Sequence, residues 1–100
     1  MKTSYATEIW FDIRPLALGA AKPARLDRWL VRKGDLVSPD LPLAEISIGG
    51  TAYQLVSLIT GRVDLIQTQA GEALHPGIGL LQVTHDVPAS GESTRLIRSL

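Results

Sequence analysis

The sequence of 100 residues contains no cysteine, so it can form neither a disulfide nor a thiolate metal site. Ten basic residues balance ten acidic ones, and this zero net charge gives no global attraction to nucleic acid or to an anionic membrane. The longest uncharged run, residues 46–61, is too short and too polar to span a bilayer. The first eight residues lack the apolar segment of a secretory signal, so we expect a cytoplasmic protein.

What the chain does contain is typical of a globular protein. Apolar residues make up 45% of the sequence and charged residues 20%, and a chain of this length can bury one core. We therefore expect one domain over residues 9–84, preceded by a loosely held arm over 1–8 and followed by a polar tail over 85–100.

A β-hairpin is predicted around the Gly49-Gly50 pair, because two-residue turns of this kind need positive φ angles that glycine adopts without steric cost. The flanking runs are rich in aliphatic and β-branched residues that alternate with polar ones. One face of the hairpin should therefore be buried; its residues are Ala44, Ile46, Ile48, Tyr53 and Leu55.

Further short strands are predicted before and after the hairpin. Apolar alternation places them over residues 9–13, 25–31, 63–66 and 80–83. Three consecutive apolar residues end the second of these, which favours a bulge or a strand covered on both faces. Residues 14–23 are read as a loop in which residues 16–21 are compatible with one helical turn. Residues 95–98 form a short amphipathic end.

An internal repeat organises the chain. Residues 26–47 resemble residues 63–84, and Gly34 and Pro39 recur 37 positions later as Gly71 and Pro76. Turn residues coincide as well as apolar ones, so the match is more than a chance agreement of hydrophobic runs. Two copies of one unit predict an all-β sandwich or flattened barrel with a pseudo-twofold axis.

Several segments resemble biotinyl/lipoyl carrier domains. The run LDRWLVRKGDLV, residues 26–37, is similar to the family's W-L-V-K-x-G-D-x-V segment, and residues 43–46 are similar to its L-A-E-I strand. Ser57 and Gly61 fall at its S-P-x-x-G connector, and residues 71–72 at its second G-D/E pair. The resemblance implies a barrel-sandwich hybrid of two four-stranded sheets.

The resemblance also locates a missing residue. In that family the hairpin tip carries D-K-A or M-K-M, and the lysine is lipoylated or biotinylated. Here Gly49, Gly50 and Thr51 occupy those positions, and no lysine follows Lys33. Because attachment needs an amine nucleophile, we expect no covalent cofactor and no enzymatic activity. The favoured function is that of an unmodified lipoyl-like domain, a protein-interaction or structural module that docks to a carrier-dependent enzyme.

Two other functions stay open. A divergent carrier of an acyl- or carboxyl-transfer system would have to use Lys22 or Lys33, neither of which is at the tip. A detached module of a transport adaptor is the other alternative, although such domains usually carry a long coiled-coil insertion at the hairpin, which the Gly49-Gly50 turn does not allow.

The remaining titratable residues point to no catalytic or metal site. His75 and His85 lack partners at metal-ligand spacing. The carboxylates near turns show no sign of a paired acid and base; they are Asp35, Asp40, Asp64 and Glu72.

A local basic cluster, formed by Arg25, Arg28, Arg32 and Lys33, is the candidate partner surface. Acidic residues interrupt it, which favours a solvated strand face over an anion-binding patch. Trp29 lies within it, and packing is favoured for this residue over recognition. If a protein partner docks on this part of the chain, we expect Trp29 and the arginines to contact it.

Overall fold

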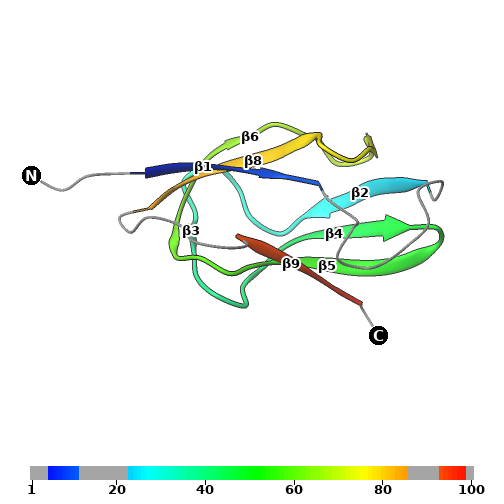
Figure 1. Ribbon diagram of the computed structural model, residues 1–100, viewed down its shortest axis with the longest axis horizontal. Helices are drawn as coiled ribbons and strands as arrows, with labels where there is room; N and C mark the ends of the chain where they lie inside the picture. Colours follow the sequence, from blue (N-terminus) through cyan, green and yellow to red (C-terminus); the bar gives the residue numbers. More distant parts are fainter. Residues whose placement is uncertain (1–4, 12–22, 86–92, 99–100) are drawn as a thin grey trace, which may run out of the picture.

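The computed structural model describes residues 5–11, 23–85 and 93–98, and these residues form β-strands and no helix. This confirms the predicted all-β class. Figure 1 shows the arrangement of the strands. The strands are β1 (Tyr5–Trp10), β2 (Ala24–Trp29), β3 (Leu36–Val37), β4 (Pro42–Ile48), β5 (Thr51–Ser57), β6 (Gly61–Ile66), β7 (Ala73–Leu74), β8 (Gly79–His85) and β9 (Thr94–Arg98).

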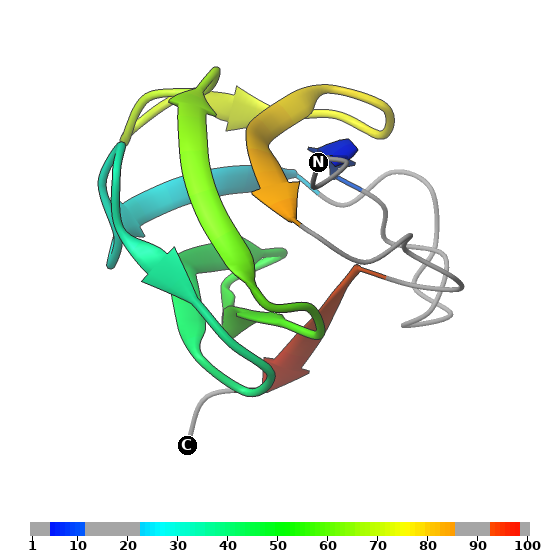
Figure 2. The ribbon, with the colours of Figure 1, turned by 90° about the vertical axis from the view of Figure 1, so that its left-hand side faces the viewer.

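The strands build two antiparallel sheets. One has the order β1-β8-β6-β3 and the other the order β7-β2-β4-β5-β9. Figure 2 shows them as curved layers on either side of the interior. The second sheet has five strands and not the predicted four, because β9 adds to the edge of β5. The two sheets are not closed into one barrel.

The repeat seen in the sequence is also a repeat in space. Strands β2, β3 and β4 recur 37 positions later as β6, β7 and β8, with the same lengths. The two copies exchange equivalent main-chain bonds: Gly34 N–H donates to Val63 O and Gly71 N–H donates to Leu26 O, each at 2.7 Å. Both glycines have positive φ, 95° and 92°. This reciprocal exchange is what an internal twofold requires, so the predicted equivalence of the two turns is confirmed.

Each copy contains a bulge at the same position. The register shifts between Leu26 and Arg28 in one copy and between Val63 and Leu65 in the other. In both, the skipped residue is an aspartate that accepts a hydrogen bond from a hydroxyl on the neighbouring strand. The extra residue changes the direction of the strand. A bulge is one of the two explanations that the run of three apolar residues at 29–31 favours, and the structure has it between Leu26 and Arg28.

The core lies between the two sheets. The hairpin prediction is confirmed: its five predicted inward residues are all buried, with Ala44 opposite Leu55 and Ile46 opposite Tyr53. The largest apolar side chains with almost no exposure come from both copies; they are Leu26, Leu43, Ile46, Ile48, Leu80 and Leu81.

The ends of the chain differ from the prediction. Strand β1 begins at Tyr5, so residues 5–8 pair with β8 and do not form a loose arm. Residues 95–98, expected to be an amphipathic end of the polar tail, belong to β9 on the edge of β5. Gly61, which the resemblance places at the end of the connector that starts at Ser57, is the first residue of β6. The predicted helical turn over residues 16–21 lies outside the described residues.

Candidate functional site

The hairpin tip between β4 and β5 is a tight two-residue turn at one end of the molecule (Figure 1). Gly49 has a φ of 56° and Gly50 a φ of 83°, so both adopt the left-handed conformation that the sequence predicts for them. Ile48 pairs with Thr51 across the turn. Gly49 N–H donates to Pro23 O at 2.8 Å, which anchors the tip to the residue before β2.

Because Gly49 and Gly50 have no side chains, the turn itself presents main-chain N–H and C=O groups. Gly49 and Gly50 are exposed and Thr51 is half-buried. A Cβ placed on Gly50 would meet no atom within 4 Å, so a side chain at this position would point into open space. The φ of 83° nevertheless strains any residue other than glycine, and the turn glycines Gly34, Gly71 and Gly77 combine the same open space with a positive φ.

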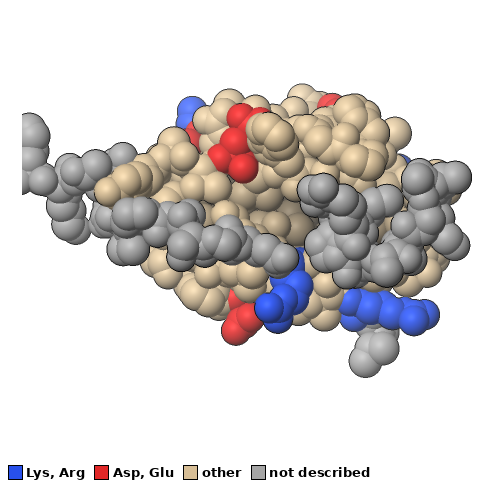
Figure 3. All heavy atoms as spheres, viewed as in Figure 1, with Lys and Arg blue, Asp and Glu red and all other residues tan. Residues whose placement is uncertain are grey.

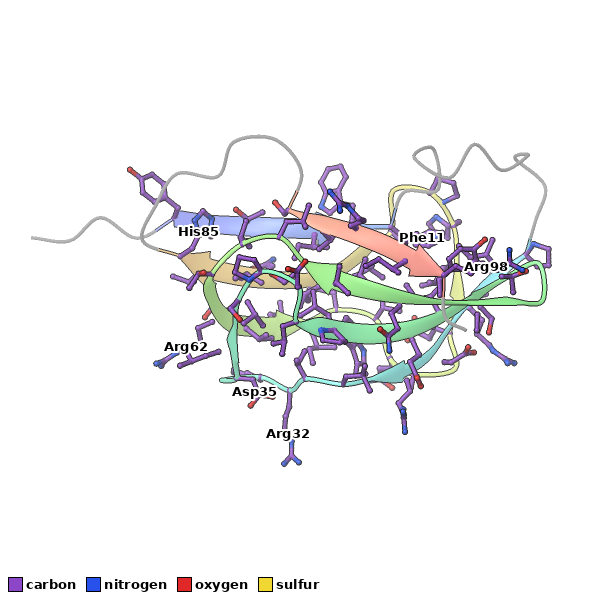
Figure 4. The ribbon with its side chains drawn as sticks, turned by 90° about the horizontal axis from the view of Figure 1, so that it is seen from below. Phe11, Arg32, Asp35, Arg62, His85 and Arg98 are labelled. Atoms are coloured by element: carbon purple, nitrogen blue, oxygen red, sulfur yellow. The ribbon has the colours of Figure 1, made fainter. Side chains whose placement is uncertain are left out.

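The predicted basic cluster is divided by the structure. Arg25 Nε lies 3.2 Å from the Asp27 carboxylate, and Arg28 Nε lies 2.9 Å from that of Glu45. Figure 4 shows Arg32 pointing away from the lower edge of the molecule, well apart from Arg98. The arginines thus lie along the length of the molecule, and two of them have acidic partners.

Trp29 is half-buried and packs against the core. Its indole N–H donates to Thr68 O at 2.7 Å. Because a buried indole needs a partner for its one polar group, this bond fixes the ring as a packing element. This is the packing role that the sequence favours for the residue.

The two histidines lie apart. His75 is exposed, with Nδ1 3.5 Å from Pro76 O. His85 is only 5% exposed; its Nε2 lies 2.5 Å from Thr7 Oγ1 and its ring stacks on Tyr5 at 5.9 Å. Across the described parts of the chain, no three His, Asp, Glu or Cys side chains gather as metal ligands would.

Of the four acidic residues near turns, two use their carboxylates in structural hydrogen bonds and the other two contribute through their main chains. Asp35 accepts a hydrogen bond from Arg32 N–H at 2.9 Å, which closes its turn. Asp64 accepts the bond from Thr84 at the bulge. Asp40 has a φ of 71° at a turn, and Glu72 O accepts from Leu26 N–H at 3.0 Å. These contacts build turns and strand pairs.

One exposed feature was missed from the sequence, the outer side of β1. Trp10 is 58% exposed there, beside the exposed Glu8. The signal was present, because placing Ile9 and Phe11 on the inward face of a strand puts Trp10 on the opposite one.

Comparison with known proteins adds no relative. Neither a scan against models of protein families nor a search of curated proteins gives a match. None of the described residues forms a helix that is long and apolar enough to cross a membrane.

Proposed function

We propose that this chain is an unmodified lipoyl-like domain with the barrel-sandwich hybrid fold. The twofold repeat of bulge, turn and strand supports this relationship. So does the strand count, since the two sheets without β9 have four strands each. The resemblance in sequence covers the same segments, residues 26–83.

The observation that carries the functional proposal is the hairpin tip. A carrier domain presents its lysine on an exposed tight turn, and here the turn is kept while Gly50 stands at the attachment position. Glycine supplies no amine for an amide bond to lipoate or biotin. The domain therefore acts without a swinging arm, as a non-catalytic module that binds a protein of a carrier-dependent enzyme complex.

Intact-mass spectrometry of the protein purified from its native host tests this proposal. The expected mass is that of the unmodified chain. A mass increase equal to a lipoyl or biotinyl group, mapped to any lysine, would contradict the proposal and favour a divergent carrier. Lys33, in the turn after β2, is one lysine at which the mapping should look for such a group.

A second experiment restores the family's tip. The triple variant G49D/G50K/T51A is incubated with a lipoate ligase, lipoate and ATP, and G49D/G50R/T51A is the matched control, because arginine offers charge but no lysine amine. Residues other than glycine cost about 1–2 kcal/mol in the left-handed region, so circular dichroism first establishes folding. Lipoylation of the lysine variant alone is expected. A folded variant that stays unmodified would show that the relation to carriers is one of fold only.

A further inference from the structure

The outer edge of β1 is the least protected sheet edge among the described strands. The two sheets end at β1, β3, β7 and β9. Strands β3 and β7 have two residues each, and β9 carries two arginines. Short length and positive charge are the usual protections of an edge. Strand β1 has six residues and a single charge, Glu8.

The internal twofold gives β1 a counterpart, which is β5. Phe11 N–H donates to Ile78 O, and Ser57 N–H donates to Leu41 O, each at 2.9 Å; Leu41 and Ile78 are 37 positions apart. Phe11 at the end of β1 thus corresponds to Ser57 at the end of β5. By the same count Trp10 corresponds to Val56, and Glu8 to Gln54.

The two counterparts differ in what covers them. Strand β9 pairs along the outer edge of β5, and Val56 is only 3% exposed. Within the described ranges no strand pairs with the outer edge of β1, and Trp10 is 58% exposed. Among the described residues, an extended segment therefore occupies one of two equivalent edges and none occupies the other.

The main chain of β1 is oriented to accept such a segment. Phe11 uses both its N–H and its C=O on the β8 side, bonding to Ile78 and Gly77. Since successive residues of a strand point their main-chain groups to opposite sides, those of Glu8 and Trp10 point to the open edge. On the covered edge, Leu58 N–H donates outward to Ser93 O at 2.8 Å, as this alternation requires.

We propose that the outer edge of β1 docks an extended segment of a partner protein with a basic–apolar–basic pattern. This rests on the proposed function as an interaction module and names the partner's chemistry. Strand β9 gives the first two positions, with Arg95 opposite Val56 and Leu96 opposite Leu55. Its next residue, opposite Gln54, is Ile97, so the second basic position is inferred from Glu8 and not from β9. On β1 the equivalent positions place an apolar residue opposite Ile9 and a basic residue opposite Trp10.

Charge and aromatic chemistry select basic residues at the two outward positions. The Trp10 ring offers its face to a guanidinium group. The exposed Glu8 carboxylate, which leans over Gly79, can turn to meet an ammonium group at the edge. Figure 3 shows acidic atoms over the part of this face where β1 and β8 lie, and basic atoms near β9 with a second acidic group beside them.

The test is an NMR titration of the full chain, labelled with nitrogen-15, with the capped peptide Thr-Arg-Leu-Lys-Val-Thr. The control peptide is Thr-Glu-Leu-Glu-Val-Thr. We expect shifts confined to β1 and the Trp10 indole, and affinity for the basic peptide at least threefold above that for the acidic one. In E8K the preference should reverse. Q54K, at the equivalent position beside β9, is the matched control and should keep the wild-type preference.

Three results would overturn the proposal. The first is equal affinity for the two peptides, or no shift at millimolar peptide. The second is a set of chemical-shift changes centred on β5 and β9 that Q54K alters and E8K does not. That result would mean that the peptide replaces β9 on β5 and does not bind to β1. The third is a dimer by analytical ultracentrifugation that W10T dissociates, since the occupant would then be a second copy. A negative titration alongside an unmodified intact mass would leave the proposal of an unmodified module in place.

Discussion

The substitution G61A gives the sharpest test of how closely β6 approaches β8. A Cβ on Gly61 would lie 2.5 Å from Thr84 O and 2.6 Å from Val83 Cγ1. Ordinary carbon–oxygen contacts are about 3.3 Å or longer, so the two strands would have to separate by about 0.8 Å. Because the nearer atom belongs to the backbone, it cannot rotate away.

The expected cost follows from two opposing terms. Overpacking of this kind costs about 1–3 kcal/mol, and the backbone contact favours the upper half of that range. Replacing glycine by alanine also restricts the unfolded chain, which returns about 0.4–1 kcal/mol. We expect G61A to lower the free energy of unfolding by about 2 kcal/mol, measured from the urea midpoint at an unchanged m-value.

The matched control is Gly50, where the constraint is of another kind. Its φ is 83°, but a Cβ there would meet nothing within 4 Å. G50A should cost only about 0.5–1 kcal/mol after the same unfolded-state gain. Asparagine tolerates the left-handed region, so G50N should recover most of this loss, whereas G61N should be at least as unstable as G61A.

The internal repeat supplies the result that would refute this reasoning. The position equivalent to Gly61, 37 residues earlier, is Ala24, which is buried beside Ile48 and Leu74. If the two copies were interchangeable, alanine would fit at both positions. A G61A midpoint equal to that of the wild type would therefore show that β6 and β8 do not approach as closely as described.

Two further predictions use residues that the structure pairs. W29F should lower the free energy of unfolding by about 1–3 kcal/mol, because it leaves the buried Thr68 carbonyl without the indole N–H. W10F changes an exposed ring and should stay within about 0.5 kcal/mol of the wild type. Urea unfolding followed by circular dichroism compares the two variants. Ser47→Ala and Thr84→Val each remove the hydroxyl bonded to a bulge aspartate, and each should cost about 1–2 kcal/mol in the same assay. Costs that differ by more than about 1 kcal/mol would mean that the two bulges are not equivalent.

The central fold could be predicted because its signals are local and occur twice. Gly34 and Gly71 mark turns that need positive φ, and the hairpin alternates around two glycines. Asp40 adopts a φ of 71° where its repeat partner is Gly77, which no local pattern indicated. Strand β9 could not be predicted because its single inward residue, Leu96, gives no alternation to read, and its partner β5 lies about 40 residues away.

The candidate site was predicted less completely than the fold. The glycine tip could be identified from residue types alone, because the sequence itself shows that no lysine amine stands at the turn. The arginines looked like one cluster because they are close along the chain, but the strand spreads them in space and pairs two of them with acidic residues. The open edge of β1 depends on which strands pair, and this becomes visible only when both sheets are assembled.

The two copies of the repeat also separate what the fold needs from what it does not explain. Bulge aspartates, turn glycines and reciprocal main-chain bonds occur in both copies, so fold stability accounts for them. In the described part of the chain, the exposed Trp10 and the unpaired edge beside it occur in one copy, where the other has a buried Val56 paired with Arg95 of β9. The stability of the shared framework would be served as well by a covered edge on both sides. The partner segment that we propose for β1 is our explanation for this difference between the copies.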